Sequence, residues 1–255
     1  MDQAQATSAT APSVPSSLGT RMMNVFMAPG ELYTEVARTP FQNSSWLVPY
    51  LVSLVMAIIF TYALYANETL RHQIYDMQIQ GMQKAVEEGK MTEAQLEQVR
   101  ERMEGTGPVL FMLIGGLTSI VFLSAFFFGA VLFLWLATRF GLKAPVSFVK
   151  VMETYGLASF IGILGMIVAL LTMYTFDSMR ATPSAVLAIL SSYDHTNKLH
   201  SFLSQLNIFT LWETALVGVG VSKLSGKSIG VGMGVAFGLW LVWAIISTLL
   251  GIGIR

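Results

Sequence analysis

Five long and nearly unbroken apolar segments constrain the fold of this chain more than any other feature of its sequence. They are residues 46–66, 108–138, 155–176, 206–224 and 231–254. A helix needs about 20 apolar residues to cross the roughly 30 Å hydrocarbon core of a bilayer. The strands of a membrane barrel would instead alternate apolar and polar residues over about ten positions. The sequence therefore predicts an all-α polytopic membrane protein with five transmembrane helices.

The composition agrees with this class and excludes several others. The chain is 54% hydrophobic and 12% charged, whereas soluble domains carry about 25% charged residues. Its 15 Lys and Arg balance its 15 Asp and Glu, so nothing attracts it to nucleic acid. It has no cysteine, which excludes disulfides and thiolate metal sites. No nucleophile elbow, kinase signature or dinucleotide fingerprint is present, so we expect neither an enzyme nor a cofactor.

Two segments precede the first predicted span. Residues 1–20 are rich in Ala, Ser, Thr and Pro and predict a disordered tail. Residues 21–38 repeat apolar side chains at three- and four-residue steps, which predicts short amphipathic helices at the membrane surface, broken near Pro29-Gly30. The second predicted span, 108–138, is longer than a perpendicular helix needs, so we expect it to tilt or to emerge from the bilayer.

Residues 67–107 predict a helical hairpin outside the hydrocarbon, with its turn at 88–90. Thr92 and Gln95 resemble a capping box that opens the second helix. Two interpretations of its apolar stripes stay open: the stripes pack on each other, or they dock a protein partner or the membrane surface. The stripes consist of Tyr75, Ile79, Met82 and Val86 in the first helix, and of Leu96, Val99 and Met103 in the second.

Basic residues in the short connections predict the orientation. Arg139, Lys143 and Lys150 precede the third predicted span, and Lys223 and Lys227 precede the fifth. In a five-span protein both connections lie on the side of the N-terminus. The positive-inside rule makes that side cytoplasmic.

Glu213 is the sharpest candidate for a functional residue, because it falls well inside the fourth predicted span. An ionised carboxylate there would cost roughly 2.5–3.5 kcal/mol or more, so it should be protonated, paired or facing water. It could relay protons or bind a cationic substrate, or it could be a hydrogen-bonded tie between helices. Glu153, near the start of the third span, is expected to pair with Lys150 three residues before it. A carboxylate pair of Glu153 and Glu213 is a further hypothesis.

Small residues recur at four-residue steps in the last two predicted spans. Gly230, Gly234 and Gly238 form one such set, and Gly218 with Ser222 forms another. Small residues at this period allow helix backbones to approach closely, so we expect a tight helix pair or the contact face of a homo-oligomer.

The three histidines, His72, His195 and His200, fall in the two segments predicted to lie outside the bilayer on the same side. The four-residue spacing between the last two matches no metal motif, and no His-Glu-x-x-His helix is present. We therefore expect solvated histidines and no metal site.

Three stretches of the chain resemble a known family. They are residues 26–33 (FMAPGELY), Pro40 with Trp46 and Pro49, and residues 206–212 (LNIFTLW) with the glycines that follow. This pattern resembles the Yip-one domain family of five-span membrane proteins, and most closely its bacterial branch, over about residues 21–254. The resemblance implies a multi-pass protein of the bacterial inner membrane, with Pro29, Glu31, Trp46, Pro49 and Trp212 as its motif residues. The chain lacks the Asp-Leu-Tyr-Gly-Pro motif of the eukaryotic members, so Rab binding is not carried over.

These observations lead to two hypotheses of function. The first is a non-enzymatic scaffold that organises the membrane or partner proteins, with the hairpin 67–107 and the segment 21–38 as contact surfaces. The second is a small permease or proton-coupled transporter that uses Glu213, with Glu153 as a possible second carboxyl. The expected partners are the lipid bilayer, proteins bound through the hairpin, and a second copy of the chain, but not nucleic acid.

Overall fold

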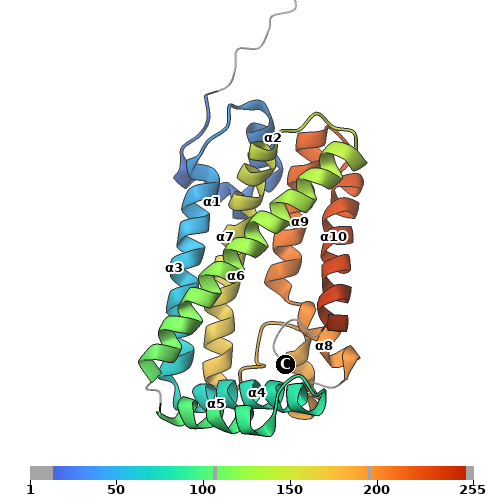
Figure 1. Ribbon diagram of the computed structural model, residues 1–255. Coiled ribbons are helices and arrows are strands. Elements are labelled where there is room, and N and C mark those ends of the chain that lie inside the picture. The colour runs from blue at the N-terminus through green and yellow to red at the C-terminus, as the bar shows by residue number, and fades with distance from the viewer. Residues whose placement is uncertain (1–13, 106–107, 195–196, 251–255) are drawn as a thin grey trace, which may run out of the picture.

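The protein is a helical bundle, and this computed structural model describes residues 14–105, 108–194 and 197–250. The secondary-structure elements within these ranges are helices, which agrees with the predicted all-α class. Five helices run along the bundle, and shorter helices cover its two ends (Figure 1). The five are α3 (Ser44–Ala66), α6 (Pro108–Leu136), α7 (Phe148–Thr175), α9 (Ile208–Ser225) and α10 (Ile229–Leu250).

Four of these helices, and not the predicted five, are long and apolar enough to cross a bilayer. They are α3, α6 with its continuation to Gly141, α7 and α10. Large apolar side chains such as Ile58, Phe122, Leu171 and Leu249 are exposed on their outer faces. An exposed apolar surface of this extent is typical of contact with membrane. The fold thus meets the requirement for a multi-pass membrane protein.

The predicted span 206–224 corresponds to α9, which is not among the four. Helix α9 has 18 residues, about 27 Å at 1.5 Å per residue, and it carries Glu213 and Lys223. Its short length and its two charged residues make it less suited to cross a bilayer as an isolated helix. The helix nevertheless runs along the bundle and packs against α7 and α10, returning the chain from the α8 end to the α2 end (Figure 1).

Helix α7 begins at Phe148, two turns before the predicted start at residue 155. The added turns contain Lys150 and Glu153, the pair that the sequence predicted near the start of this span. In the structure these two side chains form an ion pair, so they neutralise each other inside the helix.

Helix α6 corresponds to the long second span, for which the sequence predicts a tilt or an emergence from the bilayer. It has 29 residues, continues into the π-helical turn η1 (Ala137–Gly141), and crosses the bundle obliquely (Figure 1). Its end is fixed by Trp135 and Arg139, which both donate hydrogen bonds to the carbonyl of Val146 at 3.1 Å.

The predicted amphipathic segment 21–38 forms two helices, α1 (Leu18–Met27) and α2 (Pro29–Arg38), which confirms the break near Pro29-Gly30. Helix α1 begins inside the segment predicted as a disordered tail, because the Ser17 hydroxyl accepts a hydrogen bond from the Thr20 N–H and caps the helix. Residues 1–13 of that predicted tail lie outside the described residues.

The hairpin is present as α4 (Glu68–Glu87) and α5 (Glu93–Gly105), lying across the end of the bundle opposite α1 and α2 (Figure 1). The capping box is confirmed: Thr92 N–H donates to Gln95 Oε1 at 2.9 Å, and Gln95 N–H donates to Thr92 Oγ1 at 3.2 Å. Between Asn67 and Gly105, the described side chains include no exposed large apolar residue, and Leu96 is buried. The described stripe residues are therefore buried or partly buried, and Tyr75 contacts Tyr65 of α3 and Phe111 of α6. The side chain of Met103 lies outside the described residues.

The connection from α7 to α9 contains two helices that the sequence did not predict, η2 (Ala185–Ser192) and α8 (Lys198–Gln205). The side chain of Gln73 in α4 holds the start of this connection, donating to the Asp177 carbonyl at 2.8 Å and accepting from the Met179 N–H at 2.9 Å. The connection and the hairpin thus form one cap over this end of the bundle.

Helices α9 and α10 pack closely, as predicted, but through a different set of small residues on α10. A methyl group on Gly232 would overlap the Gly218 carbonyl and would lie 2.8 Å from the Ser222 Cβ. Gly218 and Ser222 therefore do lie in the contact. The predicted partners on α10 do not, because a methyl group on Gly230, Gly234 or Gly238 would meet nothing within 4 Å.

Candidate functional site

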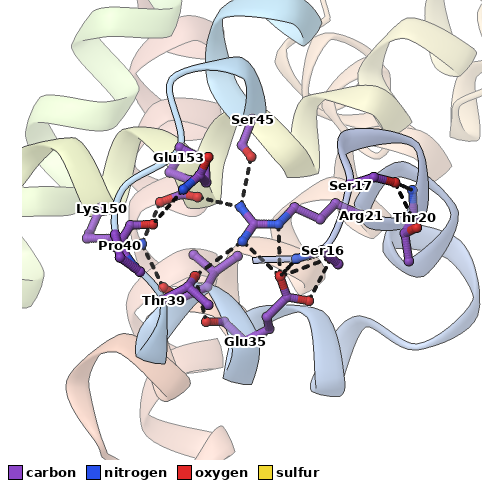
Figure 2. Close-up of polar contacts among 12 residues, drawn as sticks. Ser16, Ser17, Thr20, Arg21, Glu35, Thr39, Pro40, Ser45, Lys150 and Glu153 are labelled. Carbon is purple, nitrogen blue, oxygen red and sulfur yellow. Dashed lines mark hydrogen bonds and ion pairs between the residues drawn. The ribbon is translucent and has the colours of Figure 1, made fainter. Parts of the chain in front are cut away.

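Arg21 of α1 lies at the centre of a buried network of charged and hydroxyl groups (Figure 2). Its side chain is 1% exposed. Nη1 donates to Glu153 Oε1 at 2.7 Å and to Ser45 Oγ at 3.0 Å. Nη2 donates to Glu35 Oε1 at 2.8 Å and to Thr39 Oγ1 at 3.2 Å, and Nε donates to Glu35 Oε1 at 3.0 Å. These bonds use all five N–H groups of the guanidinium.

Glu153 of α7 is fully buried and lies between two cations. Its Oε1 accepts from Arg21, and its Oε2 accepts from Lys150 Nζ at 2.7 Å. Lys150 also donates to the Val36 carbonyl of α2 at 2.8 Å. The predicted Lys150–Glu153 pair is therefore present, but it is one half of a larger network.

Glu35 of α2 closes the network on the solvent side, where its side chain is 23% exposed. Partial burial acts to raise the pKa of Glu35, but hydrogen bonds from Ser16 and Arg21 outweigh it and the pKa is lowered. The Ser16 N–H donates to Oε1 at 2.8 Å, and the Ser16 hydroxyl donates to Oε2 at 2.8 Å. Glu35 therefore stays ionised opposite Arg21 at neutral pH.

The network is electrically balanced, since two cations face two carboxylates: Arg21, Lys150, Glu35 and Glu153. It joins α1, α2 and α7, and it reaches α3 through Ser45. Buried ion pairs add little net stability, but removal of one partner leaves a costly unpaired charge. The arrangement therefore fixes α1 and α2 in one orientation on the bundle and contains no open position for a substrate.

The outward face of α1 is apolar. Met23, Phe26 and Met27 are 61%, 45% and 76% exposed, whereas Arg21 and Val25 on the opposite face are buried. Phe26 also packs edge-on against Trp212 of α9, with ring centroids 5.9 Å apart. Helix α1 thus presents a row of large apolar side chains next to the ends of the long helices.

Glu213 of α9 lies against Gly162 of α7, where a methyl group would be 2.8 Å from its Oε2. The residue is partly buried, and its carboxyl makes no hydrogen bond or ion pair within the described ranges. The interhelical tie that the sequence left open is therefore not formed. Gly162 supplies the room that the carboxyl occupies.

Two tyrosines lie within electrostatic range of the Glu213 carboxyl, Tyr33 of α2 and Tyr155 of α7. Burial, and then the charge of Glu213, raise the pKa of Tyr33 far above its usual value. Tyr33 and Thr154 both pack against Gly220, and their buried hydroxyls have no hydrogen-bond partner in the described part of the chain. The α2–α7–α9 contact therefore contains polar groups that the protein itself leaves unsatisfied.

Glu153 and Glu213 are not brought together. Both face the interior along the α7–α9 contact, but Glu213 lies beside Gly162, nine residues after Glu153 along α7. At 1.5 Å per residue this separates the two carboxyls by about 13 Å along the helix axis. The hypothesis of a shared cation or proton is therefore wrong for this structure.

The histidines that the structure describes are surface or capping residues. His72 is 66% exposed on α4, with Nε2 3.8 Å from Glu68. His200 Nδ1 accepts a hydrogen bond from the Asp194 N–H at 2.9 Å. His195 lies outside the described residues. No group of three or more metal-ligating side chains lies together in the described ranges.

The residues that carry the family resemblance occupy distinct places in the fold. Pro29 begins α2, and Glu31 lies exposed in its first turn. Trp46 of α3 packs against Gly156 of α7, and Pro49 is buried in α3. Trp212 lies on α9 and contacts Phe26. Sequence reasoning missed the role of Arg21, because its partners Glu35 and Glu153 lie 14 and 132 residues away along the chain.

Comparison with known proteins adds no assignment: the chain matches no family model, no curated protein and no solved structure.

Proposed function

We propose that the chain is a non-enzymatic, multi-pass membrane protein that organises the membrane around it through the α1–α2 pair. The observation that carries the proposal is that the two faces of α1 differ. One face is locked to the bundle by the Arg21 network, and the other presents Met23, Phe26 and Met27. A helix with these two faces is typical of one that lies in the membrane interface.

The Arg21 network gives this surface a fixed position. A free amphipathic helix can leave the membrane or turn over, whereas α1 is bonded to α2, α3 and α7. The apolar side chains therefore stay in one plane relative to the long helices. Shallow insertion into one leaflet expands that leaflet and favours curvature.

Reconstitution of a triple variant tests this role. We expect wild-type protein to yield smaller vesicles than protein with Met23→Ser, Phe26→Ser and Met27→Ser, when vesicle diameter is measured by electron cryomicroscopy at equal protein-to-lipid ratio. The matched control places serine at the three α4 residues Gln83, Lys84 and Glu87, which are exposed outside the long helices. Equal vesicle diameters for all three proteins would contradict the proposal.

We also propose that α9 crosses the bilayer as a fifth pass, shielded by α7 and α10, with the N-terminus in the cytoplasm of a bacterium. The return path of α9 and the basic residues of the connections at the α2 end support this orientation. On the resemblance of residues 26–33, of Pro40, Trp46 and Pro49, and of residues 206–212, we propose membership of the bacterial Yip-one branch. An experimental structure of a bacterial member with a different helix order would contradict that membership.

Single cysteines test the number of crossings. The chain has no cysteine of its own, so one label reports one position. We expect Glu87→Cys and Lys227→Cys to react with an impermeant maleimide from opposite sides of the membrane. Both positions are exposed and avoid the adjacent glycines, Gly89 and Gly226, whose positive φ would strain a cysteine. Labelling from the same side would show an even number of crossings between them.

A second candidate function, proton-coupled transport, is favoured by the unpaired Glu213 carboxyl and the unsatisfied hydroxyls of Tyr33 and Thr154. We expect Glu213→Gln to abolish proton uptake into protein-containing vesicles that hold a pH-sensitive dye, because an amide cannot release a proton. Glu31→Gln, an exposed carboxyl outside the bundle, is the control. Uptake that is equal in wild type, Glu213→Gln and empty vesicles would exclude this candidate.

A further inference from the structure

A cavity of about 220 Å³ lies at the end of the bundle opposite α1 and α2, between the connection after α7 and the start of α9. Most of its lining residues have polar side chains. The residues that matter here are Arg180, Tyr193, Gln205, Asn207 and Thr210. The buried Val186 is an apolar lining residue, and none of the lining residues belongs to the Arg21 network.

Arg180 supplies the charge of this cavity. Its guanidinium lies over the ring of Tyr193, 4.6 Å from the centroid, which holds the side chain in place. Within the described residues the guanidinium makes no hydrogen bond and no ion pair. It therefore differs from Arg21, whose five donors are all used, and it keeps its N–H groups for a ligand.

The other polar side chains add donors and no negative charge. Asn207 Oδ1 accepts from the Phe209 N–H at 2.9 Å, so the amide NH₂ is its remaining polar group. The side chains of Gln205 and Thr210 make no hydrogen bond of their own in the described part of the chain. Among the described residues that line the cavity there is no Asp or Glu. Arg180 also lines a second cavity of about 180 Å³ together with Asp76, but the two residues form no ion pair in the described part of the chain.

We propose that this cavity binds a phosphate group, with the Arg180 guanidinium as the main contact and Asn207, Gln205 and Thr210 as further donors. A guanidinium fork matches the oxygens of a phosphate. The volume of about 220 Å³ leaves room for the group to which the phosphate is attached. The cavity lies at an end of the long apolar helices, so the phosphate can belong to a lipid headgroup or to a water-soluble molecule.

Two arms of one experiment distinguish these sources. In dodecyl maltoside, which contains no phosphate, binding of inorganic phosphate is measured by calorimetric titration. In mixed micelles with dioleoylphosphatidylglycerol, retained lipid is counted by native mass spectrometry. We expect Arg180→Gln to weaken binding by about tenfold or more in the arm that binds, because a hydrogen bond to a charged group is lost.

Lys84→Gln is the matched control, since it removes the same charge from an exposed site on α4 at the same end of the bundle. The site is supported if wild-type protein binds in either arm, Arg180→Gln loses that binding and Lys84→Gln keeps it. The arm in which binding occurs shows whether the phosphate belongs to a lipid or to a water-soluble molecule. Binding in neither arm, or an equal loss in both variants, overturns it. If Arg180→Gln does not fold, Gln205→Leu with Thr210→Val replaces it, and unchanged binding in that variant overturns the proposal.

Discussion

Arg21→Met is expected to destabilise the protein by about 3–5 kcal/mol, the cost typical of leaving one member of a buried ion network without its partner. Methionine fills most of the space of the arginine stem but supplies none of its five hydrogen bonds. Glu153 would keep its contact to Lys150 and lose the equally short contact to the guanidinium, while Ser45 and Thr39 would lose a donor. The measurement is unfolding of purified protein in mixed micelles, followed by circular dichroism as denaturing detergent is added.

Arg38→Met is the matched control for this prediction. Arg38 lies exposed in the last turn of α2, so its removal should change stability by at most about 0.5 kcal/mol. The double variant Arg21→Met with Glu153→Gln should recover part of the loss, because it removes the carboxylate that the single variant leaves short of charge. Equal stability of Arg21→Met and Arg38→Met would show that the network does not hold α1 in place.

The architecture of the bundle was largely predictable from the sequence, and the Arg21 network was not. An apolar run of about 20 residues indicates a helix that faces lipid. This signal is local, because a lipid-facing helix must be apolar whichever helices it packs against. The network depends on a contact between Arg21 and Glu153, which are 132 residues apart in the chain. Local periodicity contains no information about such a pairing, so the sequence suggested only the pair of Lys150 and Glu153.

Helix α9 differs from the sequence prediction for another physical reason. Its apolar run predicted a span like the others. The helix, however, is short and carries two charged residues, and it packs against α7 and α10. The sequence singled out Glu213 because a carboxyl is rare inside an apolar helix. Its surroundings were not predictable, since the facing residue is a glycine of α7, which has no side chain to give a signal.

The face of α10 that packs against α9 differs from the predicted one, and substitutions on the two faces are expected to differ strongly in their effect on stability. Gly230, Gly234 and Gly238 form a regular four-residue series, but the structure packs Gly232 and Ala236 against α9 instead. Both faces of a membrane helix are apolar, so the sequence pattern could not decide which one meets the neighbour. The two sets of residues are offset by two positions along α10. One alanine substitution in each set shows which face contacts the neighbouring helix.

Gly232→Ala is expected to destabilise the bundle by about 1–3 kcal/mol, the usual cost of forcing an added methyl group into a packed contact. The new Cβ would overlap the Gly218 carbonyl, and backbone atoms on both helices would have to move apart. Gly234→Ala adds the same methyl group to the open face, where nothing lies within 4 Å, and should be neutral or stabilising by up to about 1 kcal/mol through helix propensity. Unfolding in mixed micelles measures both. A loss for Gly234→Ala with none for Gly232→Ala would mean that the predicted face, and not the one described, contacts another helix.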